Sequence, residues 1–286
     1  MGPGFDCIGM AVDLWNELTV ERGPFEVVIN GSGAEELPTD ARNLVVIGVE
    51  AAFRAAGKPM PALRYICRNN VPHGRGLGSS SAGIVAGLLA GTSLAGLKLD
   101  YAQTLKLAAD IEGHPDNVAP AIYGGCCIGV HDGDNWVVGQ VPLPADLNTV
   151  VFVPEVTKNT NEMRAKLVPH LSRADAIYNI GRAALLVNAL ATGQLSLLKQ
   201  ATQDRLHQPA RGEVFKGLNT IIKAALNGGA HGAFLSGAGP SVMALTSGRE
   251  MTVTYEMTEA ARLHGLAGRC IVLKPALTGA HVVADA

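Results

Sequence analysis

A glycine- and serine-rich segment lies between a predicted strand and a predicted helix, and it restricts the folds open to this chain. The segment reads Pro72, His73, Gly74, Arg75, Gly76, Leu77, Gly78, Ser79, Ser80, Ser81, Ala82. Glycines adopt positive φ at little cost and let backbone N–H groups approach a ligand closely. The first turn of a helix adds N–H donors without a partner inside the helix and a partial positive charge. The segment therefore predicts an anion site suited to the phosphates of a nucleotide.

Two common phosphate motifs do not match this segment. No lysine stands in the G-x-x-x-x-G-K-[ST] arrangement, which excludes a Walker loop. The glycine spacing also differs from the dinucleotide fingerprint. The residues alone leave open a tight glycine turn that the serines cap without any ligand. We favour the phosphate site, because three glycines and three serines within the eight residues Gly74–Ser81 exceed what a helix cap requires.

The remaining pattern alternates irregularly between strand and helix signals, which predicts an α+β or an α/β fold, and we favour α+β. Asn43 is a predicted cap for a helix that begins at Leu44. We place a domain boundary near residue 145, so that the domains cover residues 1–145 and 146–286. The expected strands are 18–20, 25–29, 63–68, 126–130, 136–141 and 149–153, and the expected helices include 44–56, 101–111 and 172–192.

Composition and charge narrow the class of protein. The 286 residues are 48% hydrophobic and 17% charged, which is typical of a packed globular protein. A net charge of −2 gives no overall attraction for nucleic acid or an anionic membrane. The apolar stretch 82–99 is rich in Ala and Gly, and we expect a buried helix there rather than a membrane span. Five cysteines without a CxxC pair favour a reducing compartment over a disulfide framework or a zinc site.

Two shorter glycine-containing motifs lie near the ends of the chain. Ser236-Gly237-Ala238-Gly239-Pro240-Ser241 follows an apolar run, and we interpret it as a second strand-to-helix turn that approaches a ligand. Gly2-Pro3-Gly4-Phe5-Asp6 places an acidic residue after two glycines, in a position suited to an ammonium or a hydroxyl group. Plain turns are the alternative at both places.

Polar side chains of three further segments are candidates for binding. Glu112-Gly113-His114-Pro115-Asp116-Asn117 holds four groups that can bind metal or substrate, and its glutamate is a hard oxygen ligand suited to Mg²⁺. A polar loop with Asx turns is the alternative for that segment. Arg164 follows Thr160 in T-N-E-M-R, and Arg211 ends H-Q-P-A-R. An arginine fork matches a carboxylate, although a lone arginine also suits the solvated surface.

Taken together, these motifs resemble those of the GHMP kinases, and among them the homoserine kinase family. Residues 72–81 match the family motif P-x-G-x-G-L-G-S-S-[SA], and residues 236–241 resemble its third motif. The family's G-P-G-F-D, H-x-D-N-V-A-P, T-x-x-x-R and H-x-x-x-R have counterparts at 2–6, 114–120, 160–164 and 207–211. The resemblance spans Gly2 to about Pro275. It implies an amino-terminal domain like the ribosomal S5 fold and a ferredoxin-like carboxy-terminal domain, with the active site between them.

The resemblance also implies a reaction, the ATP-dependent phosphorylation of the L-homoserine hydroxyl to O-phospho-L-homoserine in threonine biosynthesis. It assigns ATP to Pro72–Ala82 together with Asn43, Ser236, Gly237 and Gly239. Ser80 and Glu112 would hold Mg²⁺. Many relatives place the Mg²⁺ glutamate further from the histidine, at the position of Lys106 here, and we therefore assign the metal to Glu112.

The implied substrate residues are Asp6, His114, Asn117, Thr160, Arg164 and Arg211. The resemblance implies a catalytic role for four of them, namely Asp6, His114, Asn117 and Arg211. The two arginines would bind the carboxylate of homoserine, while Asp6 and Asn117 would hold its ammonium or orient its hydroxyl. Asp6 and His114 are both candidates for a catalytic base, and we choose neither.

Three other functions stay open. One is a GHMP kinase for another alcohol, such as shikimate or mevalonate, and a second is a ligand-binding protein without catalysis on the same fold. The third, a structural module, leaves the glycine motifs unexplained. We expect a small-molecule substrate, no nucleic-acid partner and no membrane, with a homodimer left open. The expected location is the cytoplasm, or a plastid if a transit peptide has been removed.

The first motif differs from the family in one respect. In the family a strand and an Ala-Asn pair precede G-P-G-F-D, whereas this sequence begins at Met1, next to that motif. Because an absent strand leaves the backbone groups of its neighbour unpaired, we expect a version extended by this strand to be more stable. We also expect it to be more active, since the asparagine would orient the substrate beside Asp6.

Overall fold

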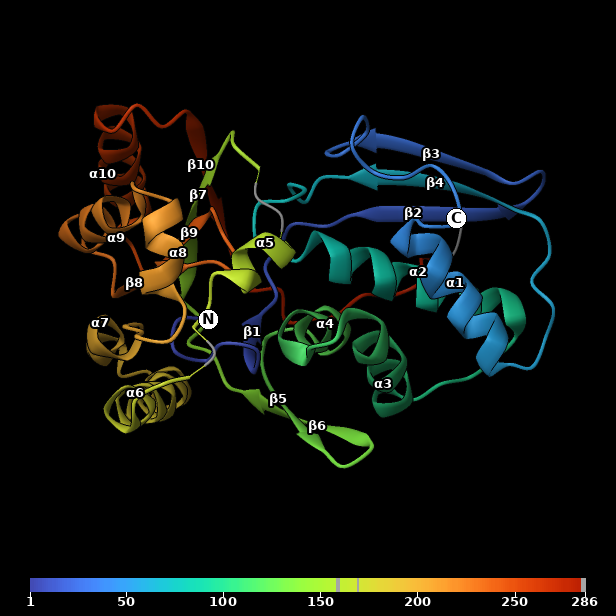
Figure 1. The fold of residues 1–286 in the computed structure, drawn as a ribbon, viewed down its shortest axis with the longest axis horizontal. Helices are drawn as coiled ribbons and strands as arrows, with labels where there is room; N and C mark the ends of the chain where they lie inside the picture. Colours follow the sequence, from blue (N-terminus) through green and yellow to red (C-terminus); the bar gives the residue numbers. More distant parts are fainter. Residues whose placement is uncertain (158–159, 169, 284–286) are drawn as a thin grey trace. The chain divides into compact units, whose positions relative to one another are not determined.

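The computed structural model describes residues 1–157, 160–168 and 170–283. The chain divides into two compact units (Figure 1). The amino-terminal unit consists of Gly9–His73, Gly78–Gly139 and the segment that begins at Ala276. The carboxy-terminal unit consists of Gln140–Pro275 together with Met1–Ile8 and Gly74–Leu77. Two short pieces from the first part of the chain thus belong to the carboxy-terminal unit, and a single boundary near residue 145 stays a prediction.

The amino-terminal unit holds helices between two sheets. In the described residues its strands are ordered β2-β4-β3 in one sheet and β1-β5-β6 in the other. Strand β4 pairs antiparallel with β2 and parallel with β3. Figure 1 shows the first sheet lying over α1 and α2. The elements are β1 (Ile8–Met10), β2 (Glu17–Arg22), β3 (Glu26–Gly31), α1 (Leu44–Ala55), β4 (Leu63–Asn69), α2 (Ser79–Ala95), α3 (Tyr101–Glu112), α4 (Pro115–Tyr123), β5 (Cys126–Asp132) and β6 (Asn135–Val141).

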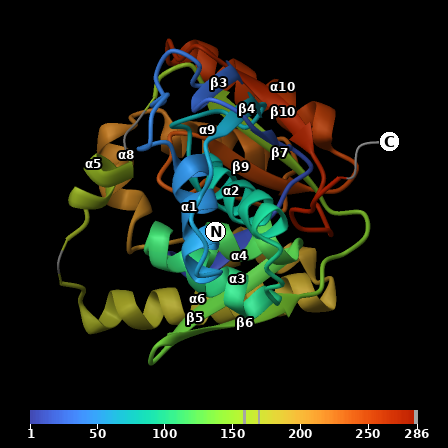
Figure 2. The same ribbon diagram turned by 90° about the vertical axis from the view of Figure 1, so that its right-hand side faces the viewer.

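Helices α1 and α2 lie side by side because small residues let their backbones approach (Figure 2). A methyl group at Gly87 would overlap the carbonyl oxygen of Val45, and one at Gly48 would overlap that of Ile84. The Ala- and Gly-rich stretch is therefore a buried helix, as predicted. Among the described residues, no helix has the length and apolar character needed to cross a membrane. This close packing fixes the axis of α2, and with it the position of the serines at its start.

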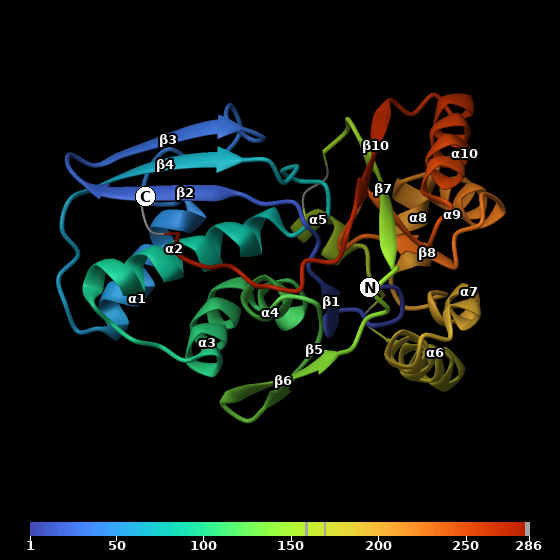
Figure 3. The same cartoon turned by 180° about the vertical axis from the view of Figure 1, so that it is seen from behind.

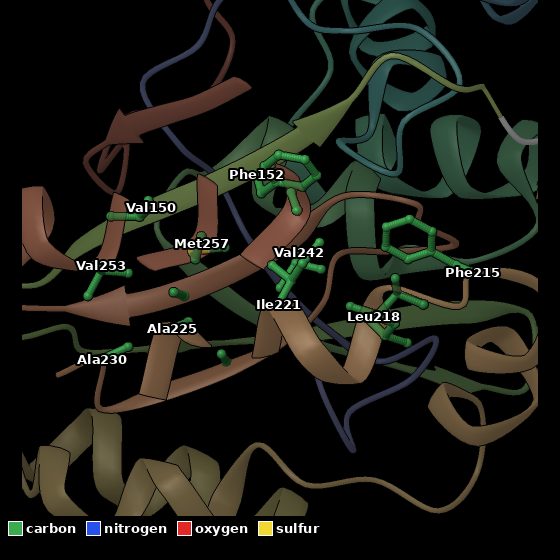
Figure 4. Close-up of a cluster of buried hydrophobic side chains, with 14 residues drawn as sticks. Val150, Phe152, Phe215, Leu218, Ile221, Ala225, Ala230, Val242, Val253 and Met257 are labelled. Carbon is green, nitrogen blue, oxygen red and sulfur yellow. The ribbon is translucent and has the colours of Figure 1, made fainter. Parts of the chain in front are cut away.

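The carboxy-terminal unit is a four-stranded antiparallel sheet with the order β10-β7-β9-β8. Figure 3 shows α9 and α10 against one face of this sheet. Phe152 and Val242 of the sheet and Leu218 and Met257 of the helices pack together in its core (Figure 4). The elements are β7 (Asn148–Pro154), α5 (Thr160–Ala165), α6 (Arg173–Thr192), the 3₁₀ turn η1 (Leu195–Leu197), α7 (Leu198–Ala201), α8 (Gln208–Val214), α9 (Leu218–Asn227), β8 (Gly232–Leu235), β9 (Val242–Thr246), α10 (Glu250–Leu263) and β10 (Gly268–Leu273).

Most predicted elements are confirmed, and the fold class is α+β as expected. Asn43 caps α1, because its side-chain oxygen accepts a hydrogen bond from the backbone N–H of Val45. One interpretation is wrong: residues 236–241 form a turn between the antiparallel strands β8 and β9, not a strand-to-helix turn. The segment after His114 also differs from the polar loop that we left open, since it begins helix α4 with Pro115 in the first turn. No disulfide joins any of the five cysteines, all of which lie in the described part of the chain.

Candidate active site

The serine-rich end of Pro72–Ala82, called the phosphate segment below, is the start of α2. Gly78 occupies the cap position with a φ of 73°, a left-handed conformation that favours glycine. No side-chain hydrogen bond caps this helix in the described structure. The hydroxyl of Ser81 is fully buried and makes no hydrogen bond among the described residues. The backbone donors of the first turn are therefore not occupied by a cap, which is the arrangement that an anionic ligand needs.

Ser80 and Glu112 come together at this helix start. The Ser80 hydroxyl donates a hydrogen bond of 2.6 Å to Oε1 of Glu112, the last residue of α3. Lys106, on the same helix, donates to Asp110 and to the backbone carbonyl of Asp134 on the exposed surface. Glu112 is thus the carboxylate that meets the phosphate segment, and two hard oxygen atoms lie within hydrogen-bond distance of one another.

The start of α4 adds a second polar group to the same unit. His114 occupies the cap position of α4, and its Nδ1 lies 2.7 Å from Oδ1 of Asp116. Asn117 donates a longer bond, 3.4 Å, to the same oxygen. A methyl group at Gly78 would lie 3.4 Å from Oδ1 of Asn117. The structure therefore brings Asn117 next to the start of α2, and Asp116 holds the imidazole of His114.

In the carboxy-terminal unit, the first part of the phosphate segment packs against the turn between β8 and β9. The Ser236 hydroxyl donates to the carbonyl of Gly76 at 2.8 Å. Arg75 donates to the carbonyls of Pro154 and Glu155, which fixes the segment to the end of β7. Gly76 and Gly237 both have positive φ, and their backbones approach closely. Two motifs that lie far apart in the sequence therefore form one glycine-lined structure.

We expect Gly76→Ala to lower the free energy of unfolding by about 3 kcal/mol or more. The new methyl group would overlap the carbonyl oxygen of Ser236, and the φ of 72° is strained for alanine. Gly57→Ala is the matched control, because Gly57 has a φ of 62° with open space around it. The control should lose only about 1–2 kcal/mol. Urea denaturation measures both, and equal losses would mean that the Gly76 contact is unimportant.

Asp6 and Arg164 form a two-pronged ion pair. Nη1 of Arg164 lies 2.7 Å from one carboxylate oxygen of Asp6, and Nη2 lies 2.9 Å from the other. Asp6 has a φ of 57°, a left-handed conformation that aspartate tolerates better than most residues. The two charges that the resemblance assigns to opposite ends of an amino acid are therefore paired with each other.

Arg211 is almost completely buried, with 2% of its surface exposed. Its Nη1 donates to the carbonyl of Gly237 at 2.9 Å and to Nδ1 of His207 at 3.1 Å. The ring of Phe5 lies beneath both guanidinium groups, 5.2 Å from that of Arg211 and 5.4 Å from that of Arg164. Phe5 thus links the two arginines through cation–π contacts.

Burial lowers the pKa of His207 to about 4, and the positive charges of Arg211 and the chain terminus act in the same direction. The carboxylate of Asp204 and the bond to Gly2 oppose this shift. The folded protein therefore binds a proton at His207 only near pH 4, whereas the unfolded chain binds it below the ordinary value of 6.5. The neutral imidazole of His207 therefore makes its full contribution to the free energy of unfolding above pH 6.5, and this contribution is lost as the pH falls toward 4.

We expect this loss to reach about 3 kcal/mol between pH 6.5 and 4, from the shift in pKa. Urea denaturation at a series of pH values, for the wild type and for His207→Gln, isolates the contribution of the imidazole. The free energy of the wild type should fall more steeply over this interval than that of the variant. Parallel curves would show that His207 does not titrate in this way.

The other predicted residues have local roles or lie outside the description. The Asn43 amide also donates to the carbonyl of Pro38, so both of its polar ends bond within the chain. The backbone N–H of His73 donates to Ser32. Thr160 begins helix α5, but its side chain lies outside the described part of the structure. Their nucleotide and substrate roles stay predictions.

Comparison with known proteins agrees with the motifs. Residues 43–125 match the GHMP kinases N terminal domain, and residues 186–262 match the GHMP kinases C terminal domain. A homoserine kinase of Desulfitobacterium hafniense is 39% identical over 285 residues, which cover 99% of this chain and 96% of that protein. The chain belongs to the homoserine kinase family. The crystal structure of a homoserine kinase from Cytophaga hutchinsonii matches with a TM-score of 0.87 and 30% identity, over 97% of this chain and 92% of that one.

The two matched domains lie in both units of the chain. A protein outside the homoserine kinase family has a similar fold. The structure of Leishmania major mevalonate kinase with R-mevalonate matches with a TM-score of 0.67 and 16% identity, over 93% of this chain and 88% of that one. That likeness shows the fold alone.

The sequence motifs included Asp116 and His207, but sequence reasoning did not predict that these residues contact His114 and Arg211. Asp116 lies two residues after His114, and His207 lies four residues before Arg211, one helical turn away. These spacings were signals that could have identified both contacts. Phe5 gave no such signal, because its contacts come from distant segments.

Proposed function

We propose that this chain transfers the γ-phosphoryl group of ATP to the hydroxyl of L-homoserine, a step of threonine biosynthesis. The observation that carries the proposal is the ion pair between Asp6 and Arg164. A carboxylate and a guanidinium held together are complementary to the ammonium and carboxylate of a free amino acid. Substrate binding would exchange one internal pair for two pairs with the ligand. Homoserine offers both charges, whereas shikimate and mevalonate offer no ammonium.

We assign the phosphates of ATP to the backbone donors of Pro72–Ala82, with Ser236, Gly237 and Gly239 beside them. The uncapped start of α2 and the buried, unbonded hydroxyl of Ser81 support the assignment. Gly76 and Ser236 hold the two glycine-rich segments together through their hydrogen bond. Within the carboxy-terminal unit, this bond fixes Gly76 against the turn between β8 and β9.

The residues present fit a magnesium ion. Ser80 and Glu112 offer a hydroxyl and a carboxylate oxygen 2.6 Å apart, and Mg²⁺ prefers such hard oxygen ligands while keeping water and phosphate in its other positions. When bound, the metal would neutralise charge that develops on the phosphates. In its absence, Glu112 holds the Ser80 hydroxyl at the start of α2.

The amino acid would be held by charged groups in the carboxy-terminal unit. We assign the carboxylate of homoserine to Arg164 and Arg211, and its ammonium to Asp6. Thr160 stands in the same motif as Arg164. Arg211 is fixed by Gly237, so the carboxylate would meet a preorganised cation.

Orientation of the hydroxyl falls to the start of α4 in this proposal. We assign it to Asn117, with His114 beside it. Because Asp116 holds Nδ1 of His114, the ring has a fixed orientation. Asp6 and His114 are both open as proton acceptors, since a loose transition state needs no strong base before the new bond forms. We propose a cytoplasmic location and a small-molecule substrate, with a homodimer left open.

A substrate panel tests the proposal. Purified chain with ATP and Mg²⁺ is offered L-homoserine, L-serine, mevalonate and shikimate, and ADP release is followed with a coupled assay. We expect turnover with L-homoserine and little with the two alcohols that lack an ammonium. Faster turnover with mevalonate or shikimate would favour a kinase for another alcohol. ATP binding without turnover on any of the four would favour a ligand-binding protein.

A further inference from the structure

His207 lies between the N-terminal segment and helix α8 of the carboxy-terminal unit. Its side chain is 3% exposed. One ring nitrogen, Nε2, lies 2.8 Å from the carbonyl oxygen of Gly2, and the other, Nδ1, lies 3.1 Å from Nη1 of Arg211. The ring also stacks on Phe5, with centroids 5.1 Å apart and planes inclined by 29°. Both ring nitrogens and one face of the imidazole are therefore in contact with other residues.

The two partners determine where the proton of the ring lies. A carbonyl oxygen only accepts hydrogen bonds, so Nε2 must carry the proton that it donates to Gly2. A guanidinium only donates, so Nδ1 must present its lone pair to Arg211. His207 is therefore neutral in one tautomer, and it connects an acceptor in the N-terminal segment to a donor on α8.

We propose that His207 is a positioning residue for amino-acid recognition, in which Nδ1 orients the guanidinium of Arg211 and Nε2 fixes the segment from Gly2 to Asp6. This role rests on the proposed function, because it assumes that Arg211 and Asp6 bind the substrate. Arg211 lies one turn after His207, so the contact acts along one face of α8. The N–H of Gly4 donates to the carbonyl of Met1, and the N–H of Ile8 donates to the carbonyl of Gly4, so the Gly2–Asp6 segment forms part of two consecutive turns.

The position of His207 is itself set by Asp204. The fully buried carboxylate of Asp204 accepts hydrogen bonds from the backbone N–H groups of Leu206, His207 and Gln208, at 3.0, 2.9 and 2.7 Å. It also accepts one from the amide of Asn179 at 2.6 Å. The backbone that carries the imidazole is therefore held at several points. Because its backbone is rigid and its tautomer is fixed, the ring holds both Arg211 and the Gly2–Asp6 segment in place.

Three substitutions separate the two contacts. His207→Asn keeps an acceptor near the place of Nδ1 and loses the donor to Gly2. His207→Gln keeps a donor that reaches the place of Nε2 and loses the acceptor for Arg211. His207→Phe keeps the ring that stacks on Phe5 and loses both hydrogen bonds. Thr149→Val is the control for destabilisation alone, because it removes a buried hydroxyl that bonds the carbonyl of Leu273 in the same unit.

Two measurements are made on each full-length variant. Steady-state kinetics gives kcat, the homoserine KM and the ATP KM. Hydrogen exchange of the peptide that covers residues 1–8 reports the stability of the N-terminal turn without any need for turnover. We expect His207→Phe to raise the homoserine KM by about tenfold or more, with smaller increases for the Asn and Gln variants and little change in the ATP KM. Exchange should accelerate in the Asn and Phe variants but not in the Gln variant.

A double-mutant cycle measures the energetic coupling between His207 and Arg211. In an Arg211→Leu background, His207→Gln should raise the homoserine KM no further, since the contact is already gone. Equal kinetics for all three His207 variants and Thr149→Val would reduce His207 to a structural residue and overturn the proposal. A wild type without homoserine turnover would instead refute the proposed function. In that event, the exchange difference between the Asn and Gln variants still decides whether His207 fixes the N-terminal turn.

Discussion

Replacing Glu112 by glutamine is expected to lower kcat by about 100-fold or more, with a much smaller effect on the homoserine KM. Glu112 is the carboxylate that meets Ser80 at the start of α2. A metal ligand acts where charge changes during the reaction, so its loss affects the transition state more than the bound substrate. Glutamine keeps the size and hydrogen-bonding capacity of the side chain but not its charge. Steady-state kinetics over a series of Mg²⁺ concentrations gives the result.

Asp110→Asn is the matched control for this prediction. Asp110 lies on the same helix, α3, where it pairs with Lys106 on the exposed surface. An exposed pair of this kind contributes little, so the control should keep its kcat and its Mg²⁺ dependence. If Glu112→Gln matches the wild type even at low Mg²⁺, the metal assignment belongs to another residue.

Arg211→Leu is expected to raise the homoserine KM by roughly 10- to 150-fold, because a charge-assisted hydrogen bond contributes about 1.5–3 kcal/mol. The ATP KM should change little. Leucine suits the buried position of Arg211, so the variant should remain folded. Circular dichroism checks the fold, and kinetics with each substrate varied in turn gives both constants.

Arg262→Leu serves as the control here, since Arg262 is an exposed residue of α10 that pairs with Glu259. We expect its constants to match the wild type. An equal loss in the ATP KM and the homoserine KM of Arg211→Leu would place Arg211 on the nucleotide side. Its bond to Gly237 in the glycine-rich turn makes this a real alternative to test.

Local sequence signals were sufficient to predict the turn before α2 and most of the helices and strands. Asn43 caps α1 because an asparagine before an apolar run accepts hydrogen bonds from the first turn. Glycines at positive φ placed the turn before α2. These features depend on neighbours in the chain, and for this reason residue type and spacing predict them.

The interpretation of residues 236–241 was wrong because the local signals that follow them are ambiguous. The run Val242–Leu245 is continuously apolar, and such a short run does not distinguish a strand from a helix. The polar loop with Asx turns that we left open for residues 112–117 is replaced by the start of α4. Pro115 occupies the first turn, where a missing N–H costs nothing. The carbonyl of Asp116, which Pro120 cannot pair, lies against Gly9.

Contacts of the charged residues depended on the tertiary fold. The Asp6–Arg164 pair joins residues 158 positions apart, and the bond from His207 to Gly2 spans 205 positions. No periodicity extends over such distances, so sequence motifs identified the candidate residues but not which of them pair. The neutral state of His207 could not be predicted from the sequence either, because it depends on burial of the side chain in the folded unit.

Identification of the product by phosphorus NMR tests the central claim most directly. Purified chain is incubated with ATP, Mg²⁺ and L-homoserine labelled with ¹³C at the hydroxyl-bearing carbon. We expect a new phosphomonoester signal that couples to the labelled carbon, in an amount equal to the ADP formed. ADP released with inorganic phosphate alone, or a phosphoryl group without coupling to that carbon, would contradict the assignment of this chain as a kinase for homoserine.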